Sequence, residues 1–131
     1  MILGLGSDII EIQRIREGLD KRPEKFLARL FTANEQSYCQ NFSDPAPHYA
    51  ARFSAKEAVA KALGIGFGKE LSWKDIEILN DKRGKPHVHF TARANLLLHT
   101  PKVAVTLSHS REYAMAVALW MQHIMPPQEE T

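Results

Sequence analysis

Hydrophobic residues recur at helical spacing in the first half of this chain and in short, strand-like runs in the second half. An apolar run with two glycines at 2–6 predicts a short buried strand, and Ser7-Asp8 directly after it predicts the entrance to a helix. Apolar positions at 12–19 and again at 26–31 follow a helical period. We therefore expect one strand followed by short helices.

A long helix is predicted in the middle of the chain. Before it, Thr32 is followed three residues later by Glu35, the pattern of a capping box at the start of a short helix. The proline-rich segment 44–47 breaks the pattern, and an alanine-rich stretch from about 48 to 63 predicts the longest helix, closed by Gly64.

The second half reads as strands. Apolar runs at 76–79 and 87–90 predict a hairpin, 92–99 predicts a short helix, and 103–107 and 113–119 predict two further strands joined by a short connection. A strand and helices followed by a strand-rich half indicate an α+β fold, with an antiparallel sheet packed against a long central helix and shorter N-terminal helices.

A chain of 131 residues fits a single domain, which we place at 1–125, with a frayed tail at 126–131. Hydrophobic residues make up 44% and charged residues 24%, values typical of globular proteins. No apolar run is long enough for a membrane span, and the N-terminus lacks the features of a signal peptide. The single cysteine, Cys39, excludes an internal disulfide and favours a reducing, cytoplasmic location, with packing as its role.

The net charge is only +2, so we expect neither nucleic acid nor membrane as a partner. Positive charge is nevertheless concentrated between residues 13 and 29, where basic residues outnumber acidic ones. The ordinary interpretation of this cluster is a solvated helical face, and the functional one is a docking surface.

Charged residues on the long helix offer candidate chemistry. Phe53, Glu57 and Lys61 follow one another at intervals of four and share one face, while Arg52 and Lys56 form a neighbouring cationic row that suits phosphates. A routine Glu57–Lys61 surface pair explains the spacing equally well.

Asp8 offers a second carboxylate from a distant part of the chain. Together with Glu57 it provides ligands for one divalent cation if the fold brings them together. Alternatively Asp8 caps a helix, because Glu11 three residues later completes the pattern of a capping box.

Other candidate sites are weaker. His109 lies at the predicted turn between the last two strands, where an imidazole suits a phosphate contact or a turn hydrogen bond. His87 and His89 share one strand face but lack a third zinc ligand, and the glycines at 64–68 lack the lysine and hydroxyl of a phosphate-binding loop.

Three segments, in this order, resemble one family: Gly6-Ser7-Asp8-Ile9-Ile10-Glu11, then Arg52-Phe53-Ser54-Ala55-Lys56-Glu57-Ala58 with Lys61, then Leu107-Ser108-His109-Ser110. The chain resembles the bacterial holo-acyl-carrier-protein synthases, the short type of 4′-phosphopantetheinyl transferase. The similarity extends over nearly the whole chain, and the helix motif is its most specific part.

The resemblance implies a fold of that family and transfer of the 4′-phosphopantetheine arm of coenzyme A to a serine of an apo acyl carrier protein, in fatty acid biosynthesis. It also implies that Asp8 and Glu57 hold Mg²⁺ and that Lys61 acts beside them. The proton of the serine goes to a metal-bound water, to Glu57 or to Lys61, and we favour Lys61 as a transition-state stabiliser or proton shuttle.

By the same resemblance Arg52 and His109 bind the 3′-phosphate of coenzyme A, and Gly84-Lys85-Pro86 borders the adenine. Ala60 and Ser110 differ from other members, which weakens the transfer of roles near them. The resemblance further implies a homotrimer with sites between subunits. The resemblance also implies that the basic segment at 13–29 binds the acidic carrier protein. The residues expected to do so are Arg14, Arg22, Lys25 and Arg29, with Phe26 or Leu27 as an apolar contact.

Two other functions remain as alternatives. A non-catalytic module would use the basic helix to bind RNA or an acidic protein. A magnesium-dependent nucleotide hydrolase would use the same two carboxylates with water as the acceptor.

Overall fold

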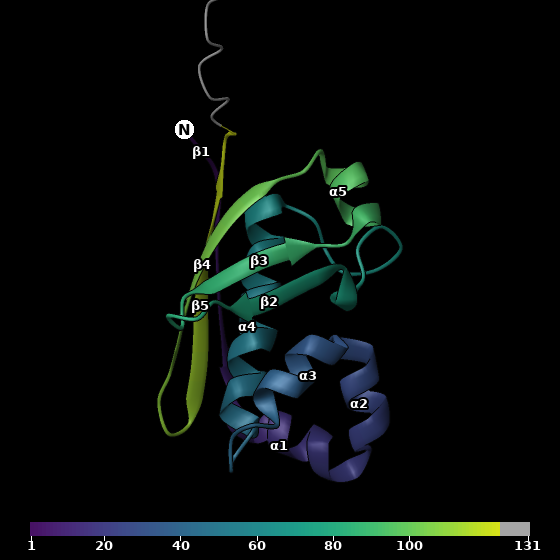
Figure 1. The fold of residues 1–131 in the computed structure, drawn as a ribbon, viewed down its shortest axis with the longest axis vertical. Coiled ribbons are helices and arrows are strands. Elements are labelled where there is room, and N and C mark those ends of the chain that lie inside the picture. Colours follow the sequence, from purple (N-terminus) through teal and green to yellow (C-terminus); the bar gives the residue numbers. More distant parts are fainter. Residues whose placement is uncertain (124–131) are drawn as a thin grey trace, which may run out of the picture.

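The structure is a computed structural model that describes residues 1–123 (Figure 1). Its elements, in chain order, are β1 (Ile2–Glu11), α1 (Ile12–Lys21), α2 (Pro23–Leu30), α3 (Ala33–Cys39), α4 (Ala46–Leu63), a 3₁₀ turn η1 (Trp73–Asp75), β2 (Ile76–Asn80), β3 (Pro86–Phe90), α5 (Ala92–Leu98), β4 (Lys102–His109) and β5 (Tyr113–Met121). The predicted tail at 126–131 lies outside the described residues.

The long helix α4 lies against one face of an antiparallel sheet with the strand order β1-β5-β4 (Figure 1). A separate hairpin of β2 and β3 also packs near α4 and beside β4, while α1, α2 and α3 gather around the N-terminal part of α4. The predicted α+β class, with an antiparallel sheet and a long central helix, is confirmed.

Most predicted elements occur close to their expected positions. Thr32 and Glu35 form the predicted capping box, since the Thr32 side chain accepts from the Glu35 amide and the Glu35 carboxylate accepts from the Thr32 amide. The long helix begins two residues earlier than expected, at Ala46, and ends at Gly64, which has a left-handed φ of 72°. Cys39 is buried in the core, and this burial raises the pKa of its thiol to about 12.

The first strand is longer than predicted, and Asp8 lies inside it. β1 pairs with β5 along most of its length, from Leu5 opposite Leu119 to Glu11 opposite Tyr113. The predicted helix entrance at Ser7-Asp8 is therefore wrong. So is the interpretation of Asp8 as a helix cap, because α1 begins at Ile12 and its N-cap has no side-chain hydrogen bond.

Two glycines let β1 approach α4 closely. A Cβ atom on Gly4 would lie 2.0 Å from the backbone oxygen of Ala62, and one on Gly6 would lie 2.1 Å from that of Ala58. Because backbone oxygens cannot turn aside, any larger residue would push the strand from the helix. The two glycines thus set the distance at which Asp8, next on the same strand face, meets α4.

The opposite face of the sheet is apolar and exposed within the described chain. Leu5 and Ile9 of β1 are 66% and 67% exposed, and Met115 of β5 is 42% exposed. Side chains alternate along a strand, so the residues that do not face α4 form one continuous surface. Exposed apolar surfaces of this kind are typical of protein interfaces.

No helix among residues 1–123 is long and apolar enough to cross a membrane.

Candidate active site

Asp8 of β1 and Glu57 of α4 line one groove of about 360 Å³, which we call the carboxylate groove. Its lining residues are Asp8, Ile9, Ile10, Arg14, Ile15, Phe26, Phe53 and Glu57. The groove therefore combines two carboxylates, one arginine and an apolar wall. The predicted meeting of the two carboxylates is present in the structure.

Lys61 lies at the edge of this groove and binds β1. Its Nζ donates to the Asp8 Oδ1 at 3.2 Å and to the Ser7 backbone oxygen at 3.0 Å. The Lys61 side chain is 54% exposed and that of Asp8 is 16% exposed, so the ammonium remains accessible to a ligand. The alternative interpretation of a Glu57–Lys61 surface pair is wrong, because in residues 1–123 the partner of Lys61 is Asp8.

The charge of Glu57 is unfavourable in this position. Burial is the main cause that raises the pKa of Glu57, and the neighbouring charge of Asp8 raises it further, against the opposing effect of Lys61. A neighbouring carboxylate that disfavours the charge of Glu57 also favours a bound cation, which would relieve the same repulsion.

Lys56, beside Glu57 in the sequence, has no access to the groove. Its side chain is fully buried, and its Nζ contacts the Glu35 Oε1 at 2.6 Å and the backbone oxygens of Leu30 and Trp73 at 2.7 and 3.0 Å. The expected cationic row of Arg52 and Lys56 for phosphates is thus wrong for Lys56, because a carboxylate inside the core already neutralises its ammonium.

Arg52 is also buried, but it has no carboxylate partner within residues 1–123. Its Nη2 donates to the Asn80 Oδ1 at 2.5 Å, its guanidinium lies 4.0 Å from the centre of the Tyr38 ring, and its Nε has no hydrogen-bond partner. A buried guanidinium whose hydrogen-bond and ring contacts are all with neutral groups favours an anion.

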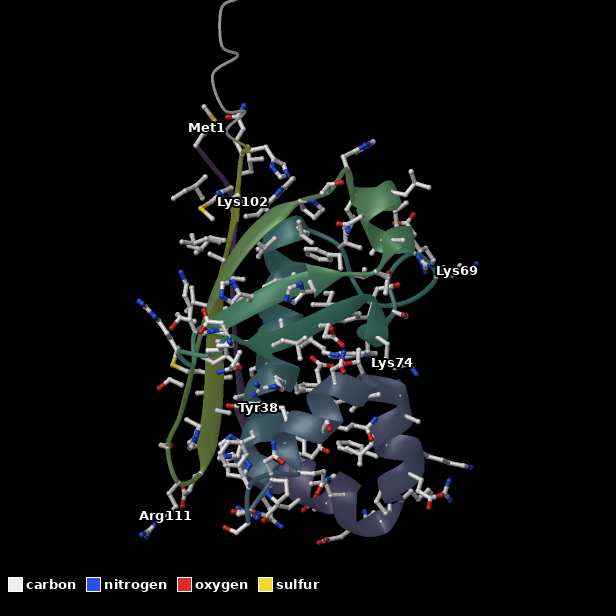
Figure 2. All side chains as sticks on the ribbon, in the orientation of Figure 1. Met1, Tyr38, Lys69, Lys74, Lys102 and Arg111 are labelled. Carbon is white, nitrogen blue, oxygen red and sulfur yellow. The ribbon has the colours of Figure 1, made fainter. Side chains whose placement is uncertain are left out.

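A second cavity, of about 240 Å³, opens at Arg52, and we call it the anion pocket. It is lined by Tyr38, His48, Ala51, Arg52, Asn80, Gly84, Pro86, Thr106, Leu107, Ser108 and His109. These residues come from α3, α4, β2, β3, β4 and the turn at 81–85. Tyr38 is labelled in Figure 2, beside the strands of the large sheet.

Comparisons with known proteins identify the family of the chain. The model of the 4′-phosphopantetheinyl transferase superfamily matches residues 4–118, which is most of the chain. The chain belongs to this superfamily. The transferase is 52% identical over 120 residues to the holo-[acyl-carrier-protein] synthase of Protochlamydia amoebophila, covering 92% of this chain and 98% of that protein.

Solved structures give the same result for the transferase fold. The holo-(acyl-carrier-protein) synthase of Bacillus anthracis, in complex with CoA (3′,5′-ADP), is 40% identical, with a TM-score of 0.78 over 92% of this chain and 96% of that one. The Helicobacter pylori synthase, in complex with coenzyme A, is 30% identical, with a TM-score of 0.82 over 89% and 99%. The resemblance seen in the sequence motifs is confirmed.

The structure of the transferase gathers most of the residues expected to bind coenzyme A. Arg52, Gly84, Pro86 and His109 all line the anion pocket. Lys85 does not, and lies instead along a neighbouring groove between β3 and β4. Its backbone amide donates to the Asp81 carboxylate, which also accepts from the Arg83 amide and shapes the turn.

The residues expected at the carrier-protein surface, four basic and one apolar, divide into two groups. Arg14 and Phe26 line the carboxylate groove itself. Arg22 and Lys25 border a shallow surface where α1 meets α2, and Arg29 is exposed in the last turn of α2. None of these cations forms an ion pair with a carboxylate of residues 1–123.

Sequence reasoning missed several residues of the anion pocket. His48 precedes Arg52 by four positions on the same helix, so helical spacing alone would have indicated it. Tyr38 and Asn80 come from distant elements and carry no comparable signal. The weak zinc interpretation gains no support, because His87 contacts Asp81 and the described residues contain no group of three metal ligands.

Proposed function

We propose that this transferase moves the 4′-phosphopantetheine group of coenzyme A to a serine of an apo acyl carrier protein and releases adenosine 3′,5′-bisphosphate. The observation that carries the proposal is the carboxylate groove, where Asp8 and Glu57 meet beside Lys61 and a basic, apolar surface. In the reaction the serine oxygen bonds to the phosphorus on the pantetheine side. The bond from that phosphorus to the bridging oxygen breaks, and its electrons leave with the nucleotide.

Asp8 and Glu57 suit a magnesium ion. Mg²⁺ in phosphoryl-transfer sites usually takes one or two carboxylates and leaves its other positions to water and phosphate oxygens. The raised pKa of Glu57 beside Asp8 is the electrostatic signature of a pair that gains from a bound cation. When bound, the ion supplies neutralisation of the pyrophosphate charge.

Lys61 and Glu57 are suited to the proton and charge of the transfer. The exposed Lys61 ammonium, held by Asp8 and the Ser7 carbonyl, stabilises negative charge on the pyrophosphate oxygens and relays a proton. A carboxylate whose pKa is raised is a better acceptor for the serine proton, which keeps Glu57 as the alternative base.

The anion pocket is proposed to bind the 3′-phosphate and adenine end of coenzyme A. Arg52 is buried with no carboxylate partner among residues 1–123, and the exposed His109 lines the same cavity. Gly84 and Pro86 form its wall at the turn between β2 and β3, where an adenine ring can lie. A phosphate supplies the negative charge that this cavity lacks.

The carrier protein is proposed to bind across α1 and α2. Acyl carrier proteins are acidic, so four cations without an ion pair in the described part of the chain would steer and orient the partner: Arg14, Arg22, Lys25 and Arg29. Phe26, half-buried on the wall of the carboxylate groove, offers an apolar contact close to the reacting serine.

A homotrimer explains how the two cavities can serve one substrate. Arg52 and Glu57 are five residues apart on α4, which separates them by about 140° around the helix axis at 3.6 residues per turn. One chain thus presents the anion pocket and the carboxylate groove on different sides. Association through the exposed apolar sheet face would bring the anion pocket of one subunit to the carboxylate groove of the next.

The direct test is the intact mass of an apo acyl carrier protein after incubation with this chain, coenzyme A and Mg²⁺. We expect a phosphopantetheine adduct that is lost with Asp8→Asn and with Glu57→Gln. A nucleotide hydrolase would instead cleave coenzyme A without a carrier, and a non-catalytic module would bind the carrier equally well in excess chelator. A cytoplasmic location stays a prediction, in keeping with a coenzyme A substrate.

A further inference from the structure

His48 lies on the wall of the anion pocket, beside Arg52 and His109. It is half-buried on α4, one helical turn before Arg52. Its ring is stacked on Phe42, with centroids 3.5 Å apart and planes 14° apart, and it meets the His109 ring edge-on at 5.6 Å. The ring is thus held in one orientation by its neighbours.

Positive charge is not balanced around His48. Arg52 and His109 line the same cavity, and the charged neighbour of opposite sign is Asp44. Asp44 is already engaged, because both of its carboxylate oxygens accept from Arg16, at 2.6 and 2.8 Å. The ring nitrogens of His48 have no hydrogen-bond partner within residues 1–123, and the buried Nε of Arg52 has none either.

The surroundings of His48 within the protein oppose a charge on its ring. Burial is the main cause that lowers the pKa of His48, and the positive charges of His109 and Arg52 lower it further, while Asp44 opposes them. Tyr38 of α3 completes the groups that face the ring. An anion bound in the pocket reverses this balance, since its negative charge favours the imidazolium and gives it an acceptor.

We propose that His48 is a third phosphate-binding side chain of the anion pocket, with Arg52 and His109, and that it increases the preference for coenzyme A over 3′-dephospho-coenzyme A. This inference rests on the proposed function, because it assigns a role within the same substrate site. Phe42 positions the imidazole through the stacked contact, and the phosphate binds with uptake of a proton.

The test compares transfer from coenzyme A and from 3′-dephospho-coenzyme A by the wild type, His48→Phe and a control, His89→Phe. Phenylalanine keeps a ring against Phe42 but removes the charge and the donor. His89 is exposed on β3, outside both cavities. The preference is the kcat/KM for coenzyme A divided by the kcat/KM for 3′-dephospho-coenzyme A. We expect His48→Phe to lower this preference about tenfold at pH 6.5, because one charge-assisted hydrogen bond to the 3′-phosphate is lost. The change should come from a higher KM for coenzyme A. The difference should shrink at pH 8.5, where the imidazole is neutral.

Calorimetry with adenosine 3′,5′-bisphosphate supplies a readout that does not need transfer. In two buffers of different ionisation enthalpy, the wild type should take up more protons on binding than His48→Phe does. If His48→Phe still transfers the group, with the donor preference and the proton uptake of the wild type, the role of His48 is overturned and the proposed function stands. Absence of transfer from either donor by the wild type would overturn the proposed function, and the calorimetry would still test the phosphate site.

Discussion

Substitution of Lys56 by methionine tests whether this lysine is structural. The ammonium contacts one carboxylate oxygen of Glu35 and two backbone oxygens, all within 3.0 Å, and both side chains are fully buried. The carboxylate also accepts from the amides of Thr32 and Ile78, each at 2.9 Å. The Lys56–Glu35 pair therefore joins α4 to α3. Through their other hydrogen bonds the two side chains also hold η1, β2 and the ends of α2 and α3 in place.

Methionine fills a similar volume but leaves the Glu35 carboxylate buried without its counter-charge. Loss of one partner of a buried pair costs about 3–5 kcal/mol in the free energy of unfolding. For a domain of this size that corresponds to a melting temperature lower by about 10–18 °C. Glu35→Gln in the Lys56→Met background should recover part of this loss, because it removes the unpaired charge and keeps the carbonyl acceptor.

Urea denaturation of the single and double variants measures these values, with Lys74→Met as the matched control on an exposed lysine. The control should change stability by less than about 0.5 kcal/mol. Below its lowered melting temperature, Lys56→Met should keep a KM for coenzyme A close to that of the wild type. A loss below about 1 kcal/mol, or a large rise in KM, would show that Lys56 acts at the substrate and not in the core.

Three further changes test the positions of the strand, the groove and the interface. Gly6→Ala should destabilise the fold by about 1–3 kcal/mol in thermal denaturation, since its Cβ would lie 2.1 Å from a carbonyl of α4, whereas Gly66→Ala, with no atom within 4 Å, should not. Glu57→Gln should abolish transfer yet raise the melting temperature at pH 7. The raised pKa means that ionised Glu57 costs stability, and this gain should vanish below the ordinary glutamate pKa of about 4.3. Leu5→Asp should give a monomer in light scattering, and Leu96→Asp, on α5 and even more exposed than Leu5, should leave the oligomer intact.

Local sequence patterns predicted most elements of the fold. The capping box of Thr32 and Glu35 and the end of α4 at Gly64 depend on residues close together in the chain, so the sequence alone indicates them. The prediction for β1 is too short, because Ser7 and Asp8 are typical of helix starts. Pairing with β5 keeps these two residues in the strand, and β5 is too far away in the sequence for a local pattern to indicate this pairing.

In the candidate site, too, short-range patterns were predictable from the sequence and long-range contacts were not. The shared face of Glu57 and Lys61 follows from helical spacing, and the motif resemblance connected Asp8 to it. The burial of Lys56 could not be predicted, because lysines are almost always exposed unless a distant carboxylate such as Glu35 pairs with them. The environment of Arg52 likewise depends on residues of four other elements, which only the folded structure brings together.

Two inactive variants in one oligomer test the shared active site most directly. Arg52→Gln disables the anion pocket of its own chain, and Glu57→Gln disables the carboxylate groove of its own chain. The two variant chains carry different tags, are co-expressed, and are purified through both tags so that only mixed oligomers remain. Each mixed cyclic trimer then contains one interface with an intact pocket and an intact groove, so we expect about one third of the wild-type transfer to apo acyl carrier protein. Activity no higher than that of the separate variants would contradict a site assembled from two subunits.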